Sequence, residues 1–404
     1  MNLHRGLEQM ERLAAPSPAR VAKATPATAR VMNDRVVLDR LLDGGAQSAP
    51  HLSRLVGLSK PTVYLSLARL EGLGLVAQAP RSPGLVGRVG RQYRVVPDIA
   101  YAAGVHLTPR RVSVAVSDVT GTVMGSASLC LQDSSADTAI AAVRTALGTA
   151  CTTTGISPEA LRSVLIGVPT AVDPSTDVLA PAVGLPGWDT SGFPRRMAAA
   201  LGTAVRFDND INMAALAELR ADAGQCDTFI TMSAGEGVGM AFVTERDPYR
   251  GVTGRAGAIH GLRVRSQAAG KLDLFSSLDE GSLLRQAEEF GIDDRDGPGM
   301  LRRATGPGAG EAERRLVTEY AEHVARGLAV PVSILDPELV VLRGSLLAAG
   351  GEELRRMVDE NLGWFTPHTP RIVLSGLGEG SVLAGALDLA VARVQQDLAD
   401  RVTG

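Results

Sequence analysis

Cysteine is scarce in this sequence. Its 404 residues include three cysteines, Cys130, Cys151 and Cys226, which lie far apart and form no CxxC pair. An odd, scattered set argues against a disulfide framework and against a cysteine-rich zinc site. The sequence also lacks a run of about 18 apolar residues that would span a membrane, and its N-terminus lacks the apolar segment of a signal peptide. We therefore expect a cytoplasmic protein without a membrane partner.

Net charge is also low, at −3, but it is unevenly distributed. Residues 1–100 contain 14 lysines and arginines against 7 acidic residues, whereas the remaining residues contain 27 against 37. The N-terminal part is therefore basic and the larger remainder acidic. Cationic side chains gain free energy by displacing counterions from phosphates, so this distribution favours an N-terminal nucleic-acid-binding module.

The chain is too long for one ordinary domain, and its composition predicts three regions. Residues 1–29 are rich in alanine, proline and arginine, and Pro16, Pro18 and Pro26 oppose a long helix, so we expect a flexible tail. We interpret residues 30–98 as a winged helix-turn-helix domain. Residues 99–404 form the third region, a larger α/β body.

The helix-turn-helix is predicted over residues 48–71. Residues 31–43 carry apolar side chains at helical spacing and precede a Gly-Gly pair. Ser48 is suited to cap a second helix, Gly57 to make the turn, and Ser59 to cap a third helix with Pro61 in its first turn. A short strand, a Gly/Pro-rich loop over residues 79–90 and a return strand over residues 91–96 then predict a wing.

Val63, Leu67 and Leu70 share one face of the third helix and should pack inward. Because a recognition helix reads bases mainly with its N-terminal residues, we expect the opposite face to contact DNA. Wing arginines could enter the minor groove. The predicted DNA-contacting residues are Ser59, Lys60, Pro61, Thr62, Tyr64, Arg69, Arg88 and Arg91. The alternative is a helical bundle used only for protein contacts.

The body alternates strand hairpins with helices in two successive halves, which predicts a two-lobed α/β architecture. Two of its segments carry chemistry. Residues 209–212 read Asn-Asp-Ile-Asn after a strand and open a helix, and residues 233–239 form the glycine loop Ser-Ala-Gly-Glu-Gly-Val-Gly.

With these motifs placed behind a helix-turn-helix, the chain resembles the ROK family of repressors and sugar kinases. The segments Gly-Arg-Ala-Gly-Ala-Ile-His at 254–260 and Leu-Arg-Gly at 342–344 add to the likeness. The resemblance implies a winged helix-turn-helix on a body of the actin-like ATPase (ribonuclease H-like) fold. It also implies that Asp210 matches the general base of the family's kinases, although Asn209 and Asp210 could instead simply cap a helix. The implied ligand-binding residues are Asn209, Asp210, Gly235, Gly237 and His260.

The departures from the family pattern concern its chemistry. Where the family has an Asp-x-Gly-x-Thr phosphate motif, this chain has His106, Thr108 and Arg110, so the acid that would help to place Mg²⁺ is missing. Ala258 replaces the glutamate that would bind sugar hydroxyls, and His260 stands one position early. Residues 262–275 contain no cysteine for the family's zinc loop. We therefore expect no catalytic residues, no metal and no cofactor.

The sequence thus predicts a DNA-binding transcriptional regulator rather than an enzyme, with repression favoured over activation. Its expected partners are double-stranded DNA with a palindromic operator, a second copy of the chain in a homodimer or higher homo-oligomer, and a small-molecule effector such as a sugar or sugar derivative. The alternative is an ATP-dependent sugar kinase with an appended DNA-binding module.

Overall fold

The computed structural model describes residues 26–80, 91–182, 184–190, 192–221, 223–259, 263–266, 270–273 and 277–403. The chain divides into two compact units. The first comprises Met1–Val96 together with Asp397–Gly404, and the second comprises Pro97–Gln396. The first unit is therefore built from both ends of the sequence. Among the described residues, no helix is both long and apolar enough to cross a membrane.

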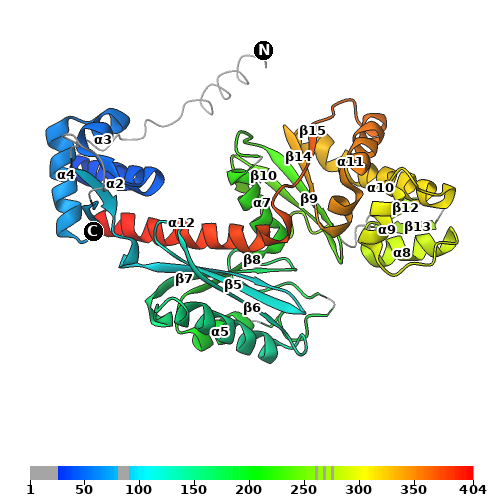
Figure 1. Cartoon of the computed structure of the whole chain (residues 1–404), viewed down its shortest axis with the longest axis horizontal. Coiled ribbons are helices and arrows are strands. Elements are labelled where there is room, and N and C mark those ends of the chain that lie inside the picture. Colours follow the sequence, from blue (N-terminus) through cyan, green and yellow to red (C-terminus); the bar gives the residue numbers. More distant parts are fainter. Residues whose placement is uncertain are drawn as a thin grey trace, which may run out of the picture. The chain divides into compact units, whose positions relative to one another are not determined.

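The first unit is a small helical domain with a three-stranded sheet (Figure 1). Its strands are hydrogen-bonded in the order β1-β3-β2. Its elements are α2 (Pro26–Gly44), β1 (Gln47–Ser48), α3 (Ala49–Val56), α4 (Lys60–Gly72), β2 (Val76–Gln78) and β3 (Gln92–Val95). This order of three helices and a terminal hairpin is that of a winged helix-turn-helix.

Local sequence signals account for most of this unit. Ser48 accepts a hydrogen bond from the His51 amide at the start of α3, and Gly57 adopts a left-handed conformation at its end, with φ of 68°. The predicted inward face of α4 is confirmed, because Val63, Leu67 and Leu70 are at most 1% exposed. Helix α2 begins at Pro26, earlier than the apolar spacing over residues 31–43 predicts.

The second unit contains two five-stranded sheets, which confirms the two-lobed α/β body. The first sheet has the order β6-β5-β4-β7-β8, in which the β4–β5–β6 meander is antiparallel and β7 and β8 add in parallel. Its elements are β4 (Tyr101–Leu107), β5 (Arg111–Asp118), β6 (Val123–Cys130), α5 (Ala136–Thr152), β7 (Leu161–Val168), α6 (Gly192–Leu201) and β8 (Val205–Asn209).

The second sheet has the order β11-β10-β9-β14-β15 and is covered by helices of the C-terminal half. A separate two-stranded sheet pairs β12 with β13. The elements are α7 (Asp210–Arg220), β9 (Phe229–Ala234), β10 (Val238–Thr244), β11 (Asp247–Pro248), β12 (Arg263–Ser266), β13 (Gly270–Asp273), α8 (Glu280–Glu289), α9 (Gly297–Ala304), α10 (Glu311–Leu335), β14 (Leu339–Arg343), α11 (Ser345–Phe365), β15 (Arg371–Leu374) and α12 (Ser381–Thr403).

Helix α12 packs unusually close to the backbone of its neighbours in the second unit. Figure 1 shows α5 on one face of the first sheet and α12 on the other. A Cβ atom at Gly104 of β4 would lie 2.4 Å from the Leu387 amide nitrogen, and one at Gly385 would lie 1.7 Å from the Met213 carbonyl oxygen of α7. Only glycine permits these approaches. The first part of α12 is therefore held against both β4 and α7.

Candidate functional site

The first candidate site is the outer face of α4. Ser59 caps this helix, and its hydroxyl oxygen lies 3.3 Å from the Thr62 amide and 2.8 Å from the Thr62 hydroxyl. Lys60 and Pro61 are exposed in the first turn, and Tyr64 is 48% exposed. The structure therefore brings five of the predicted residues together at the N-terminal end of α4. This surface has the cationic, hydroxyl and aromatic groups that can reach phosphates and base edges.

Arg69 has a different environment from the other predicted contacts. Its guanidinium donates to both carboxylate oxygens of Asp34 in α2, at 2.7 and 2.5 Å, and to Ser66. The Asp34 side chain is only 8% exposed, so this bidentate pair ties α4 to α2. Arg69 thus has a structural partner that accounts for its charge. In the wing, Arg91 is exposed, while Arg88 lies outside the described residues.

The second candidate site is a cavity of about 320 Å³ in the second unit. It lies where the carboxyl ends of strands from both sheets meet, the usual ligand position in open α/β sheets. Asn209, Asp210, Gly235 and Gly237 all line it, as the family resemblance implies. His260 lies outside the described residues, whereas Ala258 is part of the cavity wall.

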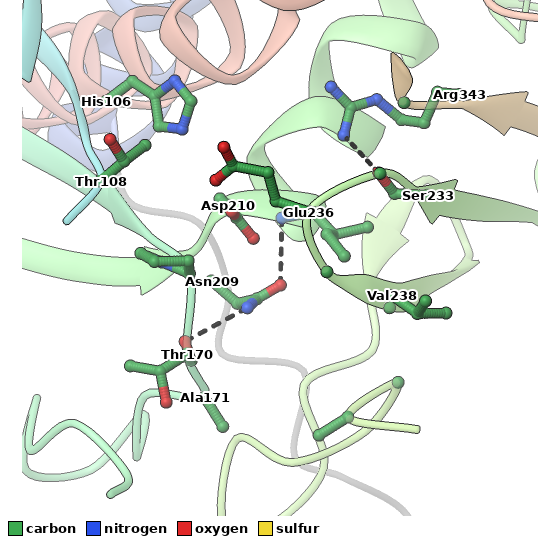
Figure 2. A pocket seen from close by; sticks show the side chains of 18 of the residues that line it. His106, Thr108, Thr170, Ala171, Asn209, Asp210, Ser233, Glu236, Val238 and Arg343 are labelled. Carbon is green, nitrogen blue, oxygen red and sulfur yellow. Dashed lines mark hydrogen bonds between the residues drawn. The ribbon is translucent and has the colours of Figure 1, made fainter. Parts of the chain in front are cut away.

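Asn209 and Asp210 have separate roles in this cavity. The Asn209 side chain caps α7 by accepting a hydrogen bond from the Ile211 amide at 3.0 Å, and it donates to the Thr170 carbonyl at 3.2 Å (Figure 2). Asp210 is the first residue of α7 and lines the cavity. Burial raises the pKa of Asp210 to about 6, and the positive charge of Arg343 opposes part of that rise. The capping interpretation thus describes Asn209, and Asp210 remains the candidate ligand-binding carboxylate.

His106 and the following turn form the wall contributed by the first sheet. His106 lies in β4, and burial together with the nearby charge of Arg343 lowers its pKa to about 4, so it is neutral at pH 7. Thr108 hydrogen-bonds within the β4–β5 turn. Arg110 extends from this turn and donates to Glu236 of the glycine loop at 3.0 Å. An ion pair therefore joins the β4–β5 turn to the glycine loop.

Arg343 is the main site residue that sequence reasoning missed. The sequence shows it in the Leu-Arg-Gly segment at the end of a buried strand, but nothing in that pattern indicates where the side chain lies. In the structure its guanidinium donates to the Ser233 hydroxyl at 3.4 Å (Figure 2). It also donates to the Ser381 hydroxyl at 2.8 Å. Burial lowers its pKa, and the carboxylates of Asp210 and Glu218 oppose that change. The cation of Arg343 and the carboxylate of Asp210 thus line the same cavity.

Within the described ranges, no group of three or more histidine, cysteine, aspartate or glutamate side chains could hold a metal ion. The segment 262–275, where the zinc loop would fall, is described only over residues 263–266 and 270–273. The carboxylates among the described residues that line the main cavity are Asp210, Glu236 and Glu379, and Glu236 is paired with Arg110. These carboxylates do not form a group that could hold a divalent cation.

Comparisons with known proteins agree with this architecture. Residues 103–269 and 303–393 match the ROK family. A xylose repressor of Caldicellulosiruptor bescii is 22% identical over 385 residues, covering 89% of this chain and 95% of the relative. The bifunctional enzyme NanE/NanK of Brucella melitensis is 31% identical over 199 residues, covering 48% of this chain and 37% of the enzyme.

A solved structure extends the likeness to the whole fold. The crystal structure of a ROK family transcriptional regulator, described as a homolog of the E. coli MLC protein, aligns with a TM-score of 0.75 at 14% sequence identity. The alignment covers 93% of this chain and 99% of that chain. It therefore includes both the first unit and the α/β body.

Proposed function

The chain belongs to the ROK family, and we propose that it is a sequence-specific DNA-binding transcriptional regulator, with repression as its sense of regulation. The observation that carries the proposal is the Ser59-capped helix α4, whose first turn leaves Lys60, Pro61 and Tyr64 exposed on a winged helix-turn-helix. Two relatives named xylose repressor and putative xylose repressor, which align along 95% of their own length, support the same reading.

The test is a binding assay with the DNA fragments that the protein occupies in a genome-wide map. We expect Thr62→Ala to weaken specific binding by about 1–3 kcal/mol while leaving non-specific binding nearly unchanged. Lys60→Ala should weaken binding to all sequences and reduce the salt dependence by about one phosphate contact. Arg195→Ala, an exposed cation of α6 in the second unit, is the matched control. Unchanged binding in both α4 variants would contradict the assignment of the recognition helix.

We propose further that the body is not a working sugar kinase. His106 stands where a kinase of this family would hold a metal-placing acid, and the cation of Arg343 lines the same cavity as Asp210. Asp210 itself favours the alternative, since a cavity carboxylate with a pKa near 6 is suited to general-base work. Incubation with ATP, Mg²⁺ and a panel of sugars separates the two. Sustained ADP release that Asp210→Asn abolishes would establish the kinase instead.

The cavity then serves as an effector site for a small polar molecule such as a sugar. Asp210 offers acceptors for hydroxyl groups, and Asn209 holds the segment in place. D-xylose is the first probe, because the relatives that align along most of this chain are named xylose repressors. Ligand at 100 times its Kd should raise the unfolding free energy by about 2.7 kcal/mol. Asp210→Ala should abolish that increase in a thermal-shift assay.

We also propose that a second copy of the chain covers an apolar surface at the ends of α10 and α11. Val330 and Ile334 lie four residues apart on α10 and are 56% and 75% exposed, and Trp364 of α11 is 88% exposed. The Arg326 guanidinium, one turn before Val330, lies 5.8 Å from the Phe365 ring centre, which places the end of α11 beside this part of α10. Exposed apolar clusters of this kind are typical of interfaces.

The charges beside this surface favour a second copy as the occupant. On α10, the Glu322–Arg326 ion pair lies within two turns before Val330. On α11, the Arg356–Glu360 ion pair lies within two turns before Trp364. These charged pairs border the apolar surface as the polar rim of an interface does, and a second copy related by a two-fold axis has the symmetry that a palindromic operator requires. Trp364→Glu should convert a dimer to a monomer in light scattering after gel filtration. Val252→Glu, at a residue 91% exposed, should not.

A further inference from the structure

One wall of the main cavity is a single short segment, residues 250–258, which follows strand β11. This wall segment contains neither helix nor strand. Four of its residues line the cavity, and all four are glycine or alanine: Gly254, Ala256, Gly257 and Ala258. Without a sheet ladder or a helix of its own, the segment depends on turns and on contacts with other elements for its position.

Arg250 fixes the start of the wall segment to strand β8. Its Nε donates to Asp208 at 2.7 Å, and its Nη1 donates to the Pro248 carbonyl at 2.9 Å and to Asp247 at 3.1 Å. The Arg250 and Asp208 side chains are only 22% and 10% exposed, so solvent ions screen this ion pair weakly. A partly buried, charge-assisted hydrogen bond of this kind is stronger than one between exposed side chains.

Asp208 stands directly before Asn209 and Asp210, the residues proposed to bind the effector. The carboxylate oxygen that does not meet Arg250 accepts from the Asn209 amide at 2.7 Å and from the Asn212 side chain of α7 at 2.9 Å. One carboxylate therefore joins the wall segment, the end of β8 and the first turn of α7.

Two close backbone approaches fix the rest of the wall segment. A Cβ atom at Gly254 would lie 1.7 Å from the carbonyl oxygen of Val172, in the segment after β7. One at Gly257 would lie 1.9 Å from the carbonyl oxygen of Met240 in β10, whose amide donates to the Gly257 carbonyl at 3.0 Å. The segment thus meets both halves of the second unit.

Of these three attachments, the Arg250–Asp208 pair is the one made by side chains. We propose that Arg250 is a positioning residue of the cavity, which holds the wall segment in place before any ligand arrives. Arg250 is not one of the residues that line the cavity, so it acts through the segment. A wall that is already ordered spares the ligand the entropic cost of ordering it, which strengthens binding. This effect on affinity rests on the proposed role of the cavity as an effector site.

Hydrogen–deuterium exchange on the intact, ligand-free protein tests the positioning role. The Ala256 amide donates to the Arg250 carbonyl and the Ala258 amide to the Arg255 carbonyl, so both amides report order in the wall segment. Arg250→Met removes the charge and keeps an apolar stem. We expect residues 251–259 to exchange at least about tenfold faster than in the parent, while β7 keeps its rate. Arg250→Lys, which retains a cation, should restore most of the protection.

The matched control is Arg206→Met. Arg206 also lies on β8 and pairs with Asp177 at 2.8 Å, so its loss should leave residues 251–259 unchanged. The positioning role is overturned if Arg250→Met exchanges like the parent in the wall segment, or if β7 becomes faster by the same factor. Should Arg250→Met not fold, Arg250→Gln decides: at least about threefold faster exchange confined to the wall segment supports the role, and the parent's rate there overturns it.

Calorimetric titration with D-xylose tests the effect on affinity. If the parent binds D-xylose, Arg250→Met should raise the Kd by about tenfold and Arg250→Lys by less. An equal Kd for Arg250→Met and the parent would overturn the link between the ordered wall and affinity. If the parent does not bind D-xylose, the effector proposal fails for that sugar, whereas the exchange experiment still decides whether Arg250 positions the wall segment.

Discussion

Asp210 and His106 should give the second unit two opposite pH dependences that nearly cancel. Burial raises the pKa of Asp210 from 3.8 to about 6 and lowers the pKa of His106 from 6.5 to about 4. A carboxyl with a raised pKa stabilises the fold at low pH, and that contribution is lost as pH rises through about 6. A histidine with a lowered pKa stabilises the fold at higher pH, and that contribution is lost as pH falls from 6.5 to 4.

Each pKa shift corresponds to a change of about 3 kcal/mol in the free energy of unfolding. The change is somewhat smaller for Asp210 because this residue faces the cavity. Between pH 4 and 6 the two contributions have opposite slopes, so the parent should show little change from this pair. Asp210→Asn removes the contribution to stability that falls as pH rises. Its unfolding free energy, relative to the parent, should therefore rise by roughly 2–3 kcal/mol between pH 4 and pH 6. His106→Gln should show the reverse trend.

Urea unfolding at several values of pH from 4 to 7 measures these differences, with tryptophan fluorescence reporting the burial of Trp188, which is 1% exposed. Asp189→Asn, at an exposed position, is the control for the substitution itself. A constant difference between Asp210→Asn and the parent across the whole range would refute the reasoning, because it would mean that folding does not change the proton affinity of Asp210.

Three further predictions concern stability. Asp34→Asn should destabilise the first unit by about 1–3 kcal/mol in thermal unfolding, because it breaks a half-buried bidentate pair with Arg69. Asp39→Asn is the control: it loses an exposed contact of 3.9 Å and should change the stability by less than about 1 kcal/mol. Gly385→Ala should destabilise the second unit by about 1–3 kcal/mol, because its Cβ would meet the Met213 carbonyl. Gly363→Ala is the control: its Cβ would meet nothing within 4 Å at an exposed helical position, so it should be neutral or stabilising by up to about 1 kcal/mol. Ser59→Ala should reduce the stability of α4 by about 1 kcal/mol through loss of its cap, and equal stability of Ser59→Ala and the parent in urea would contradict the capping role.

Local signals were sufficient to predict the helix-turn-helix from the sequence. Ser48, Gly57 and Ser59 act through hydrogen bonds and backbone conformations within a few residues, so the pattern and the structure contain the same information. The inward face of α4 followed from helical periodicity alone. The start of α2 was placed too late because proline is tolerated in a first helical turn, which makes Pro26 compatible with either a tail or a helix.

Contacts between distant residues were not predictable in the same way. Arg69 has the exposed helical position of a phosphate contact, but its partner Asp34 lies on another helix and only the tertiary fold brings the two together. The side chain of Arg343 lines the cavity because β14 ends there. The strand order that places β14 at this point cannot be predicted from the local sequence. The same holds for the last residues of α12, whose partners are near the start of the chain.

The last residues of α12 belong to the first unit but are synthesised after the whole second unit. Since residues 397–403 pack in the same unit as α2, the DNA-binding unit cannot reach its final form until the ribosome has synthesised the whole body. A nascent chain that has only its helix-turn-helix outside the ribosome lacks the contacts that residues 397–403 make in the first unit. The contacts of α12 with the first unit can therefore form only after the whole second unit has been synthesised.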